Sequence, residues 1–135
     1  MESSLQFAEV LFLIGRILFG GYFAYSGINH FIKWDMMRGF TASKGVPQAG
    51  PMVAISGILL LVGGLGIVAG VAIPWAVASL AVFLIPTSLL MHAFWKDTDP
   101  MQKMANQINF MKNMALLGAA LMLLMIPMPW AIALS

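Results

Sequence analysis

The sequence predicts an all-α membrane protein: a transmembrane four-helix bundle, antiparallel and up-down, with a short interfacial helix in the first connection. Of its 135 residues, 61% are hydrophobic and only 9% are charged, whereas a soluble domain carries about a quarter charged residues. Four apolar segments of about 20 residues are each long enough to cross a bilayer: residues 8–31, 51–71, 74–95 and 108–126. We expect one integral membrane domain over residues 1–135.

The first apolar segment carries an unusual polar face. Glu9, Arg16, Phe23 and His30 follow one another at steps of seven, so they share one side of a helix. A charge near the bilayer centre costs at least about 2.5–3.5 kcal/mol, which predicts that the face with Arg16 looks inward at other helices. The preceding tail has no basic stretch and no small-residue cleavage site follows, so we expect a retained helix rather than a signal peptide.

A short helix is expected in the first connection, residues 32–50. Trp34, Met37 and Phe40 follow one another at intervals of three residues, with charged residues between them, and this pattern favours a helix lying at the membrane interface. Gly45 is expected to stop it.

The other two connections are short and well marked. Gly70 and Pro74 are typical of a helix end and a helix start, so the second and third segments should form an antiparallel hairpin. Asp99 suits an N-cap, Pro100 the first helical position, and Gln102 the position of a capping-box partner. The fourth helix is therefore expected to start near Pro100.

Basic residues indicate the orientation in the membrane. Apart from Arg16, they all lie in or next to the first and third connections: Lys33, Arg38, Lys44, Lys96, Lys103 and Lys112. The positive-inside rule places both connections in the cytoplasm and both termini outside, in the cell membrane. Trp34 and Trp95 would mark the basic side of the aromatic belt, and Trp75 and Trp130 the other side.

Glycines crowd the second segment, where Gly66 and Gly70 form a GxxxG pair. Small residues let helices approach closely. This motif serves packing inside one bundle and homo-oligomer formation equally well, so both remain open.

Polar residues approach the basic end of the bundle from all four helices. If their faces converge, they line a pocket that opens toward the cytoplasmic leaflet; otherwise they hydrogen-bond helices together without a ligand. The candidate ligand-binding residues, including Arg16 nearer the other side, are Arg16, His30, Ser56, Ser88, His92, Trp95, Asn109 and Asn113. For Arg16, anchoring on backbone carbonyls at the glycine-rich end of the second helix and contact with a ligand both remain open.

Several kinds of chemistry are not expected. The chain has no cysteine, which excludes thiolate-bound clusters. Two histidines near one membrane end make bis-histidine haem geometrically possible, but such residues more often hydrogen-bond at the interface, so haem is not expected. No metal set or catalytic residue is identified, and the net charge of +2 gives no reason to expect nucleic acid.

The chain resembles the DoxX family of small four-helix membrane proteins. The matching stretches, in chain order, are GRILFGGYFAYSGINHF, GVP, SGILLLVGGLGIVAG, MHAFW and FMKNMALLGAAL. The resemblance matches Arg16 to an arginine often found early in the first helix, and His92, Trp95 and Asn113 to the branch with an H-x-F-W motif. Many relatives carry a glutamate around Leu60, so an Arg–Glu pair between the first two helices is unavailable here.

The resemblance implies a function in membrane redox systems, since the related DoxD proteins belong to thiosulfate:quinone oxidoreductase. We expect a membrane subunit or anchor of a quinone-linked redox system, not catalytic alone, with no intrinsic cofactor. Quinone is the candidate ligand, and a redox protein is the candidate partner. The alternative is a non-enzymatic membrane protein that binds a lipid or another small molecule.

Overall fold

A computed structural model describes residues 1–134, and every regular element in that range is helical. The all-helical prediction and the separate helix in the first connection are therefore confirmed. The elements are α1 (Glu2–Ile32), α2 (Trp34–Ser43), α3 (Ala49–Ala69), α4 (Ile73–Met91), the 3-10 turn η1 (Phe94–Lys96) and α5 (Pro100–Leu123).

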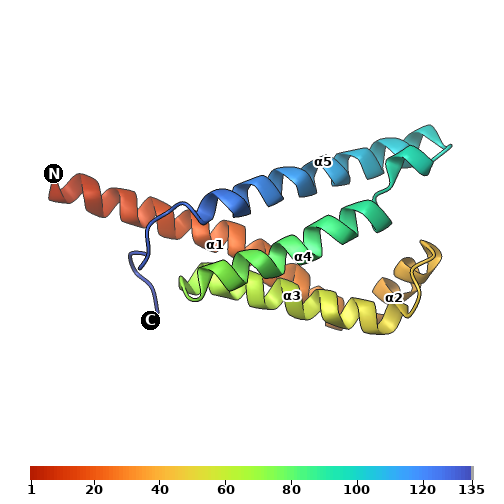
Figure 1. Ribbon diagram of the computed structural model, residues 1–135, viewed down its shortest axis with the longest axis horizontal. Coiled ribbons are helices and arrows are strands. Elements are labelled where there is room, and N and C mark those ends of the chain that lie inside the picture. The colour runs from red at the N-terminus through yellow and green to blue at the C-terminus, as the bar shows by residue number, and fades with distance from the viewer. Residues whose placement is uncertain (135) are drawn as a thin grey trace.

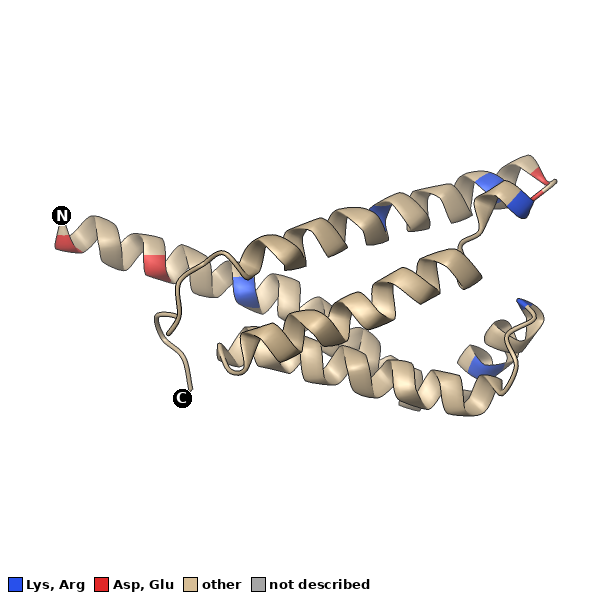
Figure 2. Ribbon diagram, viewed as in Figure 1, with Lys and Arg blue, Asp and Glu red and all other residues tan. Residues whose placement is uncertain are grey.

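Three stretches of the described chain are long and apolar enough to cross a membrane: α1, α3 and the stretch Ile73–Lys96, which joins α4 to η1. The fourth long helix, α5, carries two lysines and three asparagines and is not among them. Figure 1 shows the four long helices running back and forth, with α2 and the α4–α5 connection at one end. Both termini and the α3–α4 turn lie toward the other end, and the lysines and arginines other than Arg16 lie toward the α2 end (Figure 2).

Helix boundaries follow the local signals in the sequence. Gly70 ends α3 with a left-handed φ of 73°, and Pro74 lies in the first turn of α4. Asp99 caps α5, because its Oδ2 accepts a hydrogen bond from the Gln102 backbone N–H at 3.0 Å. One boundary differs: α4 ends at Met91 instead of continuing to Trp95, so that His92 is its C-cap.

Glycines set the closest helix contact, between α1 and α3. A Cβ added to Gly64 would lie 2.5 Å from both the Gly20 carbonyl oxygen and the Ala24 backbone nitrogen. Seven residues along each helix, a Cβ on Gly27 would lie 2.8 Å from the Gly57 carbonyl oxygen. Only residues without a side chain allow the two backbones to meet this closely.

The GxxxG pair of α3 is used elsewhere in the chain. A Cβ on Gly66 would lie 2.8 Å from the Ala76 side chain of α4, while Gly70 is the helix C-cap. Both glycines thus pack within one chain.

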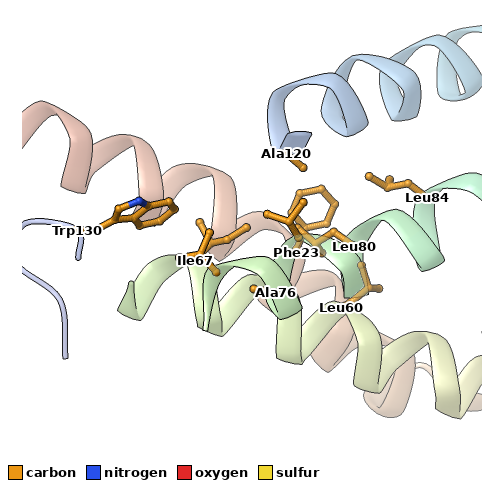
Figure 3. Close-up of a cluster of buried hydrophobic side chains, with 10 residues drawn as sticks. Phe23, Leu60, Ile67, Ala76, Leu80, Leu84, Ala120 and Trp130 are labelled. Carbon is orange, nitrogen blue, oxygen red and sulfur yellow. The ribbon is translucent and has the colours of Figure 1, made fainter. Parts of the chain in front are cut away.

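The apolar core lies between α1, α3 and α4 and is closed by α5 and the C-terminal segment (Figure 3). Phe23, Leu60 and Leu80 lie at its centre, each at most 1% exposed. The buried cluster consists of Phe23, Leu60, Ile67, Ile73, Ala76, Val77, Leu80, Leu84, Ala120 and Trp130.

On α5 the outward face is apolar and the inward face carries polar groups. On α5, Asn106 and Asn113 are buried, while Met104, Ile108 and Met111 are more than half exposed. This distribution is the reverse of that in a soluble helix and suits a helix whose outer face contacts lipid.

Candidate functional site

Two adjoining cavities open at the end of the bundle where α2 lies. Their volumes are about 260 and 180 Å³, and they are called here the outer and the inner chamber. The chambers share five wall residues, so they form one continuous site: His30, Met37, Phe83, Thr87 and His92.

The outer chamber is largely apolar. Its walls come from α2, the α2–α3 loop, α3 and α4, and include Phe40, Val46, Met52, Val53 and Leu90. Ser56 contributes a hydroxyl to this wall. Such a lining suits the hydrocarbon part of a ligand.

The inner chamber is richer in polar groups and reaches α5. Ser26, Asn29 and Asn113 line it together with the two shared histidines. Asn113 is only 6% exposed as a residue, and no side-chain hydrogen bond within the described chain holds its amide. No fully buried polar side-chain atom in residues 1–134 lacks a partner, so this amide is open to the inner chamber that it lines. At the rim, Lys112 Nζ donates to Tyr22 Oη at 3.2 Å.

His30 is oriented by its own helix. Its Nδ1 lies 2.7 Å from the Ser26 carbonyl oxygen, one turn earlier in α1. A carbonyl oxygen can only accept, so Nδ1 carries the proton and donates. The ring packs edge-on to Phe83, with 6.1 Å between centroids, which fixes it as a wall of both chambers.

His92 is held by a chain of two polar residues. Its Nδ1 lies 3.3 Å from Asn106 Oδ1, and Asn106 Nδ2 donates to Asp97 Oδ2 at 2.7 Å. Asn106 is buried on α5, whereas Asp97 lies between η1 and α5. The early end of α4 is what places the ring beside α5, because His92 has left the helical geometry.

Arg16 lies away from the chambers, at the opposite end of the core. Its guanidinium donates to four backbone carbonyls, at distances of 2.7–3.2 Å. Two carbonyls belong to the end of α3, at Ile67 and Val68, and two to the C-terminal segment, at Ala131 and Ile132. The side chain is 2% exposed, so it faces inward as predicted and is held by the end of α3.

Aromatic rings complete the surroundings of Arg16. The guanidinium carbon lies 5.6 Å from the ring centroids of both Phe12 and Trp130, within range of cation–π attraction. Trp130 is only 4% exposed. The expectation that it marks the aromatic belt is therefore wrong, because its ring covers this buried cation.

The structure brings four of the candidate site residues together and keeps four apart. His30, Ser56, His92 and Asn113 line the chambers, whereas Arg16, Ser88, Trp95 and Asn109 do not. The Ser88 hydroxyl donates to the Leu84 carbonyl at 2.7 Å. Trp95 is half exposed and packs on Phe94 and Phe110.

Several site residues escaped the sequence reading. On α1, Ser26 lies four residues before His30 and three before Asn29, so helical spacing alone would have grouped Ser26 with each of them. Thr87 lies on α4 after Pro86. Asp97 carried no local signal, since only the fold brings it to Asn106.

The arrangement suits a small amphiphilic ligand better than a metal. In residues 1–134, no cluster of three or more histidine, aspartate or glutamate side chains could hold a metal ion. Two oriented imidazoles and one amide that is open to the inner chamber can instead hydrogen-bond oxygen atoms of an organic ligand, and the apolar chamber can enclose the rest of it.

A comparison with protein families places the chain in its class. The DoxX profile matches residues 11–93, a stretch that begins within α1 and ends just after His92, so that α5 lies outside it. No curated protein and no solved structure matches the chain significantly. With three apolar helices able to span a bilayer and a family match over more than half its length, the chain is an integral membrane protein of the DoxX family.

Proposed function

We propose that this protein is a four-span membrane subunit of a quinone-linked redox system, with the quinone in the two chambers beside His30 and His92. The observation that carries the proposal is the contrast between the chambers. A polar inner chamber, to which the amide of Asn113 is open, suits the oxygen-bearing ring, and the adjoining apolar chamber suits the hydrocarbon chain.

A ligand of the quinone class, in its oxidised or reduced form, fits this site chemically. Its two ring oxygens need hydrogen-bonding groups, and His30 on α1, His92 at the end of α4 and Asn113 on α5 line the inner chamber. Met37 and Phe83 lie where the chambers join, and such flexible and aromatic side chains pack well on a flat ring. When bound, the quinone would supply two-electron chemistry that the side chains of this chain lack.

Electrons would have to reach this site from a partner protein. The chain has no cysteine to hold an iron–sulfur cluster. Figure 2 shows the basic end of the molecule, with α2 and the α4–α5 connection. Residues of α2 line the outer chamber, so this end is adjacent to the site and is the natural place for such a partner.

The fourth span of the proposal is α5. Its 24 residues extend about 36 Å, enough to cross a hydrocarbon core. Its charges and amides are tolerable in a membrane because Asn106 and Asn113 face inward, while Met104, Ile108 and Met111 face outward. Burial of the polar face explains why hydropathy alone does not identify the span.

Single cysteines test this topology, because the native chain has none. In intact cells that carry the protein in their cell membrane, a membrane-impermeant maleimide should leave Ser43→Cys and Thr98→Cys unlabelled until the cells are opened. Met128→Cys should react from outside. The expected outer location of the C-terminal Ser135 lies outside the described residues, so Met128 serves in its place. Equal labelling of Thr98→Cys and Met128→Cys from the same side would reject the fourth span.

The ligand is tested by purification in mild detergent, solvent extraction and measurement of quinone per chain by chromatography. We expect close to one quinone per native chain and strong loss in Asn113→Leu and His92→Phe. Gln107→Leu is the matched control, since it removes an exposed amide from the same helix and should keep the ligand.

The alternative function is binding of a lipid or another small molecule without redox chemistry, and the largely apolar outer chamber favours it. Mass spectrometry of the same extract separates the two. A lipid that is lost from Asn113→Leu and kept in Gln107→Leu, with no quinone, would replace the proposal by this alternative.

A further inference from the structure

We infer that the chambers are built for a ligand that donates hydrogen bonds, that is, for the hydroxyl-bearing quinol rather than the carbonyl-bearing quinone. Asp97 is the positioning residue that leaves His92 with a hydrogen-bond acceptor, and this preference for a donor is called here the polarity of the site. The identity of the ligand rests on the proposed function. The polarity of the site does not, because it follows from hydrogen bonds within the chain.

Asp97 determines which nitrogen of His92 carries the proton, because it orients the Asn106 amide between them. A carboxylate can only accept, so the Asn106 atom beside it at 2.7 Å is the amide nitrogen. The other end of that amide, Oδ1, can then only accept, and it lies 3.3 Å from His92 Nδ1. His92 Nδ1 must carry the proton, and Nε2 of the neutral ring is left with a lone pair.

His30 also carries its proton on Nδ1, but through a different partner. The Ser26 carbonyl oxygen, 2.7 Å from Nδ1, accepts and cannot donate. Nε2 of His30 therefore also carries a lone pair when the ring is neutral. Two histidines from α1 and α4, both in the walls of both chambers, thus present acceptors.

A ligand hydroxyl can donate to such an acceptor, whereas a ligand carbonyl oxygen would meet it lone pair to lone pair. Asn113 can donate or accept and so favours neither form. Lys112 Nζ is already paired with Tyr22 Oη at the rim. The histidines therefore decide between quinol and quinone.

The first experiment measures the histidine tautomers without any ligand. With ¹⁵N-labelled histidine at pH 8, where an ordinary imidazole is neutral, both native rings should show the proton on Nδ1; His30→Phe assigns the two signals. Asp97→Ala should convert His92 to a tautomer mixture and leave His30 unchanged. Asp35→Ala, an exposed carboxylate in the other connection, should change neither. A native His92 with its proton on Nε2 would overturn the inference.

The second experiment compares binding of 2-methyl-1,4-naphthoquinone and its reduced quinol to delipidated protein under anaerobic conditions. The quinol gains a hydrogen bond to a histidine Nε2 where the quinone meets a repulsion, so we expect about tenfold tighter binding of the quinol. Asp97→Ala should reduce that ratio, and Asp35→Ala should keep it.

The outcomes separate the two proposals. Equal or tighter binding of the quinone, with the Nδ1–H tautomer present, overturns the inference and leaves the proposed function standing. Binding of neither form overturns the quinol assignment together with the proposed function, while the tautomer measurement still reports on Asp97.

Discussion

The polar side chains at the two ends of the bundle differ in how much of their hydrogen-bonding capacity is used within the chain. At the end that holds Arg16, four of the five guanidinium N–H groups meet backbone carbonyls of α3 and the C-terminal segment. At the end that holds His30 and His92, both rings line the chambers and each has only its Nδ1 hydrogen-bonded within the described chain, while the amide of Asn113 is open to the inner chamber.

This difference distinguishes a structural polar group from one available to a ligand. Burial alone does not, since Arg16 and Asn113 are 2% and 6% exposed. What differs is whether the hydrogen-bonding capacity is used within the chain. The unused capacity of Asn113 lies open to the inner chamber rather than in the packed core, so it is available to a ligand.

The largest effect is expected at Arg16. Replacement by leucine removes a buried charge, but it also leaves four carbonyls without their donor. It removes the bridge that the guanidinium makes between α3 and the C-terminal segment, where the bond from the Leu134 N–H to the Ala69 carbonyl remains. Because hydrogen bonds to a charged group contribute about 1.5–3 kcal/mol each, we expect Arg16→Leu to lower the free energy of unfolding by at least about 3 kcal/mol, measured by denaturation in detergent.

Arg16→Lys is the comparison variant, because it keeps the charge and loses the planar fork. It should be intermediate in stability, with the quinone content of the folded fraction unchanged. Loss of ligand from a folded Arg16→Lys protein would show that this end of the bundle also contacts the ligand.

The second effect concerns the glycine contact that joins the two ends. Gly64→Ala places a Cβ 2.5 Å from backbone atoms of Gly20 and Ala24, so α1 and α3 must separate. Overpacking of this kind costs about 1–3 kcal/mol. Gly21→Ala is the matched control, since a Cβ there meets nothing within 4 Å, and should be at least as stable as the native chain. Equal melting temperatures for the two variants would contradict the close helix contact.

At the ligand end no loss of stability is expected. Asn113→Leu replaces an amide that is open to the chamber and held by no side-chain hydrogen bond in the described chain, so the ligand-free protein should be at least as stable as the native chain. The same variant should lose its quinone. A destabilised Asn113→Leu protein without ligand would mean that the amide has a structural partner, and the contrast between the two ends would fail.

The smallest effect is expected at the start of α5. Asp99→Ala removes an exposed N-cap bond to Gln102 and should lower stability by about 1 kcal/mol or less. Lys103→Leu is a suitable control, because Lys103 lies four residues after Asp99, is exposed, and makes no side-chain cap bond. A melting curve of Asp99→Ala that matches the native one would argue that the packing of α5 on α4, and not the cap, fixes where the helix begins.

Much of the fold could be predicted from short signals because helix ends are local events. Gly70 adopts a left-handed φ that other residues avoid, Pro74 suits a first turn, and Asp99 caps its own helix. The end of α4 at Met91 could not be read this way, since the residues that follow contain no glycine or proline until Pro100.

The site could be predicted only in part. His30, Ser56, His92 and Asn113 were found because polar residues near one membrane end of a helical bundle are conspicuous. Asn109 was grouped with Asn113 because the two share a helix at a spacing of four, yet it is Asn106, seven residues from Asn113, that is buried with it. Spacing defines a face, but not the direction in which that face points.

The sequence by itself determined that the chain is a helical membrane protein, where most helices begin and end, and that Arg16 must face inward. These are consequences of hydropathy, backbone conformation and the energy of a charge in lipid. Only the tertiary structure decided what Arg16 binds, which asparagine meets His92, and that Asp97 orients that pair. Those contacts join residues far apart in the chain, and they depend on how each helix is rotated when the glycines of α1 and α3 come together.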